Sequence, residues 1–351
     1  MRTRLHARRA VRVTVLAAVA GTAVACGGAD TPDTPDTPGT PSAESSRLAG
    51  EELWVNPEGH GPAAVQQAVA EGRTADAEAL APLADQPTAT WIATPDNPYP
   101  AVEEVSRAAA AEDELPVLVA YNVPGRDCGS YSAGGAPDVD TYLSWIGSFA
   151  AALGDRPAVV VLEPDAVPQA LEGCAGVDAA ARYQTLGQAV DILDRQPQTR
   201  VYVDAGNASW VEDLPALADA LRRSGVDRAD GFALNVSNYE TNEASADYGR
   251  RLSRELEAGA PEGTPPAHFV VDTSRNGAGP PEDAPGGEGR WCNPPGREVG
   301  DAPTTSPDLD GVDALLWVKQ PGDSDGTCAG GPPAGQWWPE MALELVDGEE
   351  G

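Results

Sequence analysis

Two aspartates stand where apolar, strand-like runs end. Asp127 follows the run VLVAYNVPG, and Asp165 follows AVVVLEP. Between them, apolar residues from Val139 to Leu153 recur at i, i+3, i+4 and i+7, which is the period of a helix packed on a sheet. Strand, helix and strand in this order predict a parallel crossover, and the loops that follow parallel strands open on one face. We therefore expect both carboxyl groups in one cleft.

A pair of carboxyl groups in a cleft can cleave a glycosidic bond. Inverting hydrolysis needs a protonated carboxyl near the leaving oxygen and a carboxylate, or a carboxylate-held water chain, on the opposite face about 6.5–9.5 Å away. The acid must stay protonated near neutral pH, so burial or a nearby negative charge must raise its pKa. Asp127 and Asp165 can supply this arrangement. The alternative for either residue is a helix N-cap or a turn.

The two segments also carry a resemblance to a known family. YNVPGRDC with the Ser/Gly-rich loop after it, and then VLEPDAV, resemble glycoside hydrolase family 6, the inverting cellulases that cut β-1,4-glucan. Further matching segments extend the resemblance over residues 53–346. It implies that Asp127 is the general acid, and that Asp165 keeps Asp127 protonated and steadies the developing oxocarbenium charge. It also leads us to expect Arg126 to orient or pair with Asp165.

Other strand-end residues match functional positions of the family. Tyr121 matches a tyrosine that helps to distort the sugar ring, with a core aromatic as the alternative. Asp325 matches the residue most often proposed as the base, with a structural or sugar-binding carboxylate as the alternative. Tryptophans in a cleft can stack on the apolar faces of glucose units, although tryptophans are core residues by default. The expected substrate-binding residues are Trp91, Asp204, Asn207, Trp210, Asn235, Asn238, Trp291, Lys319 and Asp323.

One of these positions departs from the family. Asn207 stands where many relatives have histidine, in the segment DAGNASW. Asparagine keeps hydrogen-bonding capacity but lacks the imidazole. We expect Asn207 to change the affinity of the sugar subsite at this position, and not the function of the general acid Asp127.

Seven apolar runs, each ending in polar residues, are expected to position these groups. They span residues 88–95, 116–125, 158–166, 200–207, 231–238, 268–277 and 314–322, with amphipathic segments between most of them. Alternating strands and helices predict a parallel α/β barrel, with an open doubly wound sheet as the alternative. Seven runs agree with the distorted, incompletely closed TIM-like β/α barrel that the resemblance implies. We expect residues 48–348 to form this catalytic domain.

The N-terminal region has the pattern of an export signal. The segment MRTRLHARRAVR is positive and VTVLAAVAGTAVA is apolar, so we expect residues 1–25 to be a signal peptide. Cleavage before Cys26 would leave a cysteine at the mature N-terminus, as in bacterial lipoproteins. Ordinary cleavage after an A-x-A site is the alternative. Residues 26–47 are Thr/Pro-rich, with almost no apolar side chain to bury, and predict a disordered tether behind the lipid-attachment cysteine.

The remaining four cysteines favour disulfides. An even number in an exported chain points to an oxidising compartment, and four cysteines allow three pairings. The crossover places Cys128 and Cys174 on neighbouring loops of one face, which favours that bridge together with Cys292–Cys328. The family has the same pairing pattern. Four free buried thiols are the alternative.

The composition of the chain limits the kinds of binding partner that we expect. The chain has 55 acidic and 23 basic residues, a net charge of −32, so phosphate backbones would be repelled and nucleic acid is not expected. An uncharged β-1,4-glucan is compatible with such a surface. The histidines show no metal-ligand spacing and no H-E-x-x-H is present, so we expect neither a metal nor a cofactor. We expect a monomer that reaches a membrane only through a lipid on Cys26.

The lengths of the strand-end loops bear on the mode of cleavage. The chain passes quickly from Asp165 to the next helical pattern, and only residues 277–307 form a long Pro/Gly-rich loop. A single long loop can cover only part of a cleft and cannot enclose the substrate in a tunnel. We therefore expect a secreted endoglucanase with an open cleft. The alternatives are an exo-acting cellobiohydrolase of the same family, a catalytically silent glucan-binding protein, and a barrel that acts on another polysaccharide.

Overall fold

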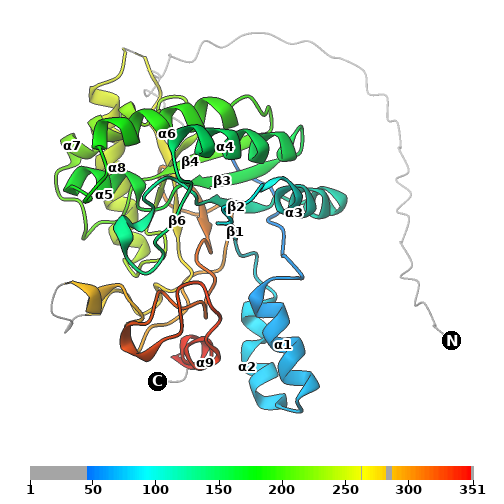
Figure 1. The fold of residues 1–351 in the computed structure, drawn as a ribbon. Helices are drawn as coiled ribbons and strands as arrows, with labels where there is room; N and C mark the ends of the chain where they lie inside the picture. The colour runs from blue at the N-terminus through cyan, green and yellow to red at the C-terminus, as the bar shows by residue number, and fades with distance from the viewer. Residues whose placement is uncertain (1–45, 262, 282–286, 349–351) are drawn as a thin grey trace, which may run out of the picture. The chain divides into compact units, whose positions relative to one another are not determined.

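The computed structural model describes residues 46–261, 263–281 and 287–348. The leader, Cys26 and most of the expected tether lie outside these ranges. The described chain contains one sheet of seven parallel strands in the order β1 to β7 (Figure 1). The strands are β1 (Thr90–Ile92), β2 (Val117–Ala120), β3 (Ala158–Leu162), β4 (Thr199–Asp204), β5 (Gly231–Leu234), β6 (His268–Asp272) and β7 (Val312–Leu316). Each expected run contains or overlaps one strand, and most of its trailing polar residues form the loop.

The sheet curls toward closure without completing it. Where β1 and β7 approach, the described residues form an isolated parallel bridge between Thr88 and Trp317 instead of a continuous ladder. The backbone of Ala89 donates to the Trp317 carbonyl at 2.9 Å, and the indole of Trp91 donates to the Val318 carbonyl at 2.8 Å. The expectation of a distorted, incompletely closed seven-stranded barrel is confirmed.

Most helices follow a strand and pack against the outside of the sheet. The helices are α1 (His60–Ala70), α2 (Thr74–Ala84), α3 (Tyr99–Glu112), α4 (Val139–Leu153), α5 (Ala166–Glu172), α6 (Ala179–Leu193), α7 (Leu214–Arg223), α8 (Asn242–Ala258) and α9 (Pro339–Asp347). Several begin at a side chain that caps a free backbone N–H. Asp138 caps α4, Asp178 caps α6 and Thr241 caps α8. No helix within the described ranges is both long and apolar enough to cross a bilayer.

Alternation along the strands gives the protein two apolar layers. In β3, Val160 and Leu162 belong to the large cluster that also holds the buried faces of the covering helices. Val159 and Val161 belong to a second cluster, inside the curl of the sheet, with Tyr202. Successive side chains of a strand point to opposite faces, so a parallel strand covered on both faces is apolar throughout. The interior is therefore packed, and a site must lie at the ends of the strands.

The first two helices stand apart from the strand–helix alternation. The pair α1–α2 packs against α9 through a third apolar cluster that includes Leu80, Leu83, Trp317 and Ala342. Trp317 follows β7 directly, so this pair is anchored beside the loop that leaves the last strand. The contact brings the N-terminus of α1 to the β7–α9 loop, which matters for the site below.

Candidate active site

The carboxyl groups expected to act on substrate gather at the carboxyl ends of the strands. Asp127 lies in a short 3₁₀ turn after β2, Asp165 follows β3, and Asp325 lies in the loop after β7. Asp127 and Asp165 have positive φ values of 57° and 70°, as does Glu163 at 49°. This region is sparsely populated by residues other than glycine, and such residues cluster at functional sites. The local backbone is therefore consistent with a site built by the loops after β2 and β3.

Asp127 has the properties of a carboxyl group that can hold a proton. Its Oδ2 accepts a hydrogen bond from the Ser132 backbone at 2.6 Å, and its Oδ1 accepts one from Gln169 Nε2 at 3.3 Å. Burial raises the pKa of Asp127, and these hydrogen bonds and Arg126 offset the rise only in part. The direction agrees with the expected acid, but burial and not a neighbouring negative charge is the main cause.

Asp165 lies in an acidic cluster. The carboxylate of Asp204 accepts the backbone N–H groups of Asp165 at 2.9 Å and Gly206 at 3.1 Å. Burial, followed by the charges of Asp204, Asp127 and Asp325, raises the pKa of Asp165 well above its usual range. Burial also raises the pKa of Asp204 to about 7. The cluster therefore holds protons at pH values where isolated aspartates are ionised.

Tyr121 joins these carboxyl groups to the seam of the barrel. Burial raises its pKa well above the usual range, and the charges of Asp165 and Asp127 raise it further. The ring meets Trp91 edge-on at 5.2 Å, and the guanidinium of Arg126 lies 4.5 Å above it. Tyr121 is buried, as the core alternative predicts, and its part in distorting a sugar ring stays a prediction.

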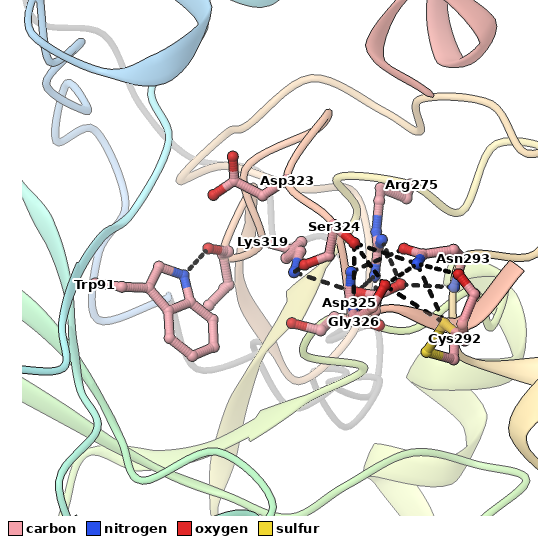
Figure 2. Close-up of polar contacts among 12 residues, drawn as sticks. Trp91, Arg275, Cys292, Asn293, Lys319, Asp323, Ser324, Asp325 and Gly326 are labelled. Atoms are coloured by element: carbon pink, nitrogen blue, oxygen red, sulfur yellow. Dashed lines mark hydrogen bonds and ion pairs between the residues drawn. A yellow bond between two sulfur atoms is a disulfide. The ribbon is translucent and has the colours of Figure 1, made fainter. Parts of the chain in front are cut away.

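Asp325 is held by a cluster of donors (Figure 2). Arg275 donates to both oxygens at 2.9 and 3.0 Å, and Lys319 Nζ lies 3.1 Å from Oδ1. The hydroxyl of Tyr239 and the backbone of Asn293 donate to Oδ2. Burial alone would raise the pKa of Asp325, but the charges of Arg275 and Lys319 outweigh it and lower the pKa to about 2. Asp325 is therefore ionised throughout the ordinary pH range.

Comparison with known proteins identifies the family. A profile of Glycosyl hydrolases family 6 matches residues 48–349. The chain belongs to this family. The resemblance noted in the sequence is thereby confirmed, and the carboxyl groups above lie in a glycoside hydrolase.

Its relatives include several endoglucanases. Endoglucanase 1 of Streptomyces sp. (strain KSM-9) is 44% identical over 274 residues, which cover 76% of this chain and 70% of that protein. Endoglucanase A of Cellulomonas fimi is 42% identical over 275 residues, which cover 77% of this chain and 56% of that protein. The structure of endoglucanase Cel6 from Mycobacterium tuberculosis, in complex with methyl-cellobiosyl-4-deoxy-4-thio-β-D-cellobioside, aligns with a TM-score of 0.78 and 38% identity. That alignment covers 87% of this chain and 99% of the Cel6 chain.

Four residues expected to bind substrate in this family 6 enzyme are buried and engaged by the protein. Asp204 is buried, and its carboxylate accepts a hydrogen bond from the Asp165 backbone. Asn235 is fully buried, and its amide bonds to the Glu240 and Asp272 backbone. The side chain of Asn207 accepts from Ser209, and Lys319 is committed to Asp325 and the Ser324 carbonyl. Direct sugar contact by these four residues stays a prediction; in this structure their side chains are buried and bond to the protein.

The other expected contacts are more open. Trp291 is 36% exposed and meets the ring of Tyr131 edge-on at 6.2 Å. Trp91 and Trp210 are partly buried against the two main apolar clusters. Asn238 is partly exposed. Trp291 thus presents the largest free aromatic surface of the three tryptophans.

Arg126 does not form the pair expected of it. Among the described residues its guanidinium makes no ion pair with Asp165, and it donates to the backbone carbonyls of Ser132, Ala93 and Tyr121. These bonds tie the β2 loop that carries Asp127 to the loop after β1. Arg126 therefore helps to hold the loop of Asp127 in place through backbone carbonyls.

Both expected disulfides are present and hold strand-end loops. Cys128–Cys174 joins the turn that carries Asp127 to the segment after α5, and Cys292–Cys328 joins the loop of Trp291 to the loop of Asp325. The cysteine count and the crossover were sufficient to predict this pairing.

Three residues that contact Asp325 or Asp323 were not predicted from the sequence. Arg275 and Tyr239 bind Asp325, and His60 contacts Asp323. Arg275 lies in DTSRNG, directly after a strand, so a charged residue at a strand end was an available signal. His60 had none, because its position depends on how α1 packs against the last loop.

Proposed function

We propose that this protein is an inverting endo-β-1,4-glucanase that uses Asp127 as its general acid. The observation that carries the proposal is a half-buried Asp127 carboxyl of raised pKa beside Tyr121 and Asp165. A protonated Asp127 can donate to the glycosidic oxygen as the bond to the sugar breaks. Tyr121 and Asp165 then border the ring on which positive charge develops, and ionisation of Asp165 would stabilise that charge.

Asp325 is proposed to act on the attacking water without first capturing a proton itself. A carboxylate whose pKa is about 2 is a weak proton acceptor near neutral pH. Its fixed charge, oriented by Arg275 and Lys319, can polarise and align a water chain that carries the proton away. This modifies the expected role of Asp325 as base, because its donors lower its basicity.

Endo action is favoured by four relatives. The endoglucanases of two Streptomyces strains, Cellulomonas fimi and Thermobispora bispora are 40–44% identical, whereas the cellobiohydrolase CEL6B of Podospora anserina is 33% and Endoglucanase-6B of Humicola insolens 29% identical. The test is to follow viscosity and reducing ends of carboxymethylcellulose together. A steep early fall in viscosity per bond cut supports internal cleavage. Cellobiose release at nearly constant viscosity would favour the exo-acting alternative, and no reducing ends at all would favour a silent glucan-binding protein.

The export and lipid attachment of the chain are proposed on the sequence alone. Cys26 lies outside the described residues, and the positive, apolar and small-residue order before it supports cleavage and lipidation there. Intact-mass analysis after native expression should show a diacylglyceryl addition. A soluble product that begins at Cys26 without added mass would remove the anchor. Light scattering of the purified protein tests the proposed monomer.

A further inference from the structure

His60 contacts an acidic residue of the β7–α9 loop from outside the barrel. It is the first residue of α1, and its Nδ1 lies 2.6 Å from Oδ1 of Asp323. The His60 backbone also donates to Gln320 Oε1, whose amide nitrogen in turn bonds to the Ala89 carbonyl. Gln320 and Asp323, both in the β7–α9 loop, therefore hold the start of α1 and the imidazole of His60 in place.

The contact leaves two polar atoms available. Because the Asp323 oxygen accepts at Nδ1, Nε2 is the remaining hydrogen-bonding atom of the ring, and no described residue is its partner. Asp323 Oδ2 also accepts no hydrogen bond from the described residues. The Asp323 side chain is only 10% exposed, whereas that of His60 is 44% exposed. A buried carboxylate thus presents one oxygen beside an exposed imidazole.

The surroundings suit a sugar better than a free ion. The ring of Trp337 lies 6.2 Å from the imidazole and supplies an apolar surface. Figure 2 shows the Asp323 carboxylate set apart from the Asp325 cluster, on the side of Lys319 where Trp91 lies. Hydrogen bonding to Asp323 raises the pKa of His60, against the opposing effects of burial and Lys319. An imidazole that is hydrogen-bonded to a carboxylate offers further hydrogen-bonding atoms to neighbouring hydroxyl groups.

We propose that His60 is a sugar-binding residue, and that with Asp323 it holds two hydroxyl groups of one glucose unit at the end of the cleft formed by α1 and the β7–α9 loop. The proposal rests on the glucanase function above. The α1–α2 pair, which is not part of the barrel, then contributes a residue to substrate specificity.

The test measures binding of cellohexaose to the Asp127→Asn enzyme by calorimetry. Adding His60→Ala should weaken binding about tenfold, as expected for the loss of a hydrogen bond to a charged group. His60→Gln should recover most of the affinity, because the amide can reach both Asp323 and a hydroxyl. In the active enzyme, the loss from His60→Ala should fall more on KM than on kcat.

Two controls separate binding from packing. Glu58→Gln changes an exposed side chain in the same segment and should leave affinity unchanged. His268→Gln breaks the other His–Asp contact, to Asp313, and should lower thermal stability without the same loss of affinity. Equal affinity of the parent and His60→Ala overturns the proposal, as does a loss in His60→Ala and His60→Gln alike that follows their melting temperatures. If the parent itself does not bind cellohexaose and the native enzyme releases no reducing ends, the proposed glucanase function fails instead.

Discussion

Arg275 donates from both terminal nitrogens to the two oxygens of Asp325, at 2.9 and 3.0 Å. The Arg275 side chain is fully buried, and that of Asp325 is 6% exposed. Such a bidentate pair fixes the carboxylate in one plane as well as neutralising it. The orientation of Asp325 toward the cleft therefore depends on a residue that comes from a different strand-end loop.

Replacing Arg275 by methionine should destabilise the protein strongly. The change keeps much of the side-chain volume but leaves the Asp325 carboxylate with Lys319 as its one remaining cationic partner. Breaking a buried pair by removing one member typically costs about 3–5 kcal/mol. Urea unfolding at pH 7 measures the loss. Arg107→Met, at a side chain that is 67% exposed, is the matched control and should change stability by less than about 1 kcal/mol; equal effects at both sites would contradict the structural role.

Asp127→Asn should slow hydrolysis according to the leaving group. Asparagine cannot donate the proton, so the rate on cellotetraose should fall by about 10²–10⁴. Aryl cellobiosides with nitrophenol leaving groups need little protonation and should lose much less. Steady-state rates on the two substrates test this. An equal loss on both, with cellohexaose binding intact, would remove Asp127 from the role of acid.

The first product should be the α-anomer. In an inverting reaction, water attacks the face opposite the departing group of a β-glycoside. Proton NMR during the first minutes of cellotetraose hydrolysis separates the two anomeric signals before mutarotation mixes them. Initial accumulation of the β-anomer would mean retention, and the roles given to Asp127 and Asp325 would then have to be exchanged for a nucleophilic mechanism.

The sequence predicted the strands and loops that carry the site better than the contacts between its side chains. Apolar runs that end in polar residues located all seven strands, because the carboxyl ends of parallel strands are where buried chain becomes loop. The sequence could not show that the Asn235 amide bonds to the Glu240 backbone, or that Lys319 pairs with Asp325. Both contacts depend on how loops that are distant in the sequence pack together. His60 was invisible for the same reason: its partner Asp323 lies 263 residues away.

Glu163 provides a final prediction, on stability and pH. It is buried between the two catalytic loops, where its carboxylate accepts the backbone N–H groups of Asn122 and Val123. Burial raises its pKa to about 7, although the two backbone hydrogen bonds oppose the rise. A carboxyl group whose pKa is raised on folding stabilises the native state below its unfolded pKa, and this contribution is lost as the pH rises through the folded pKa.

The wild-type protein should therefore lose stability from about pH 4.5 to pH 7, the interval between the unfolded and folded pKa of Glu163, and Glu163→Gln should lose less. Glutamine keeps an oxygen that can accept from the loop but cannot ionise, so its stability relative to wild type should rise by up to about 3 kcal/mol across this interval. Urea unfolding at several pH values gives the two curves. Glu104→Gln, on the exposed face of α3, should run parallel to wild type. Parallel curves for Glu163→Gln as well would show that the Glu163 carboxylate does not titrate in this range.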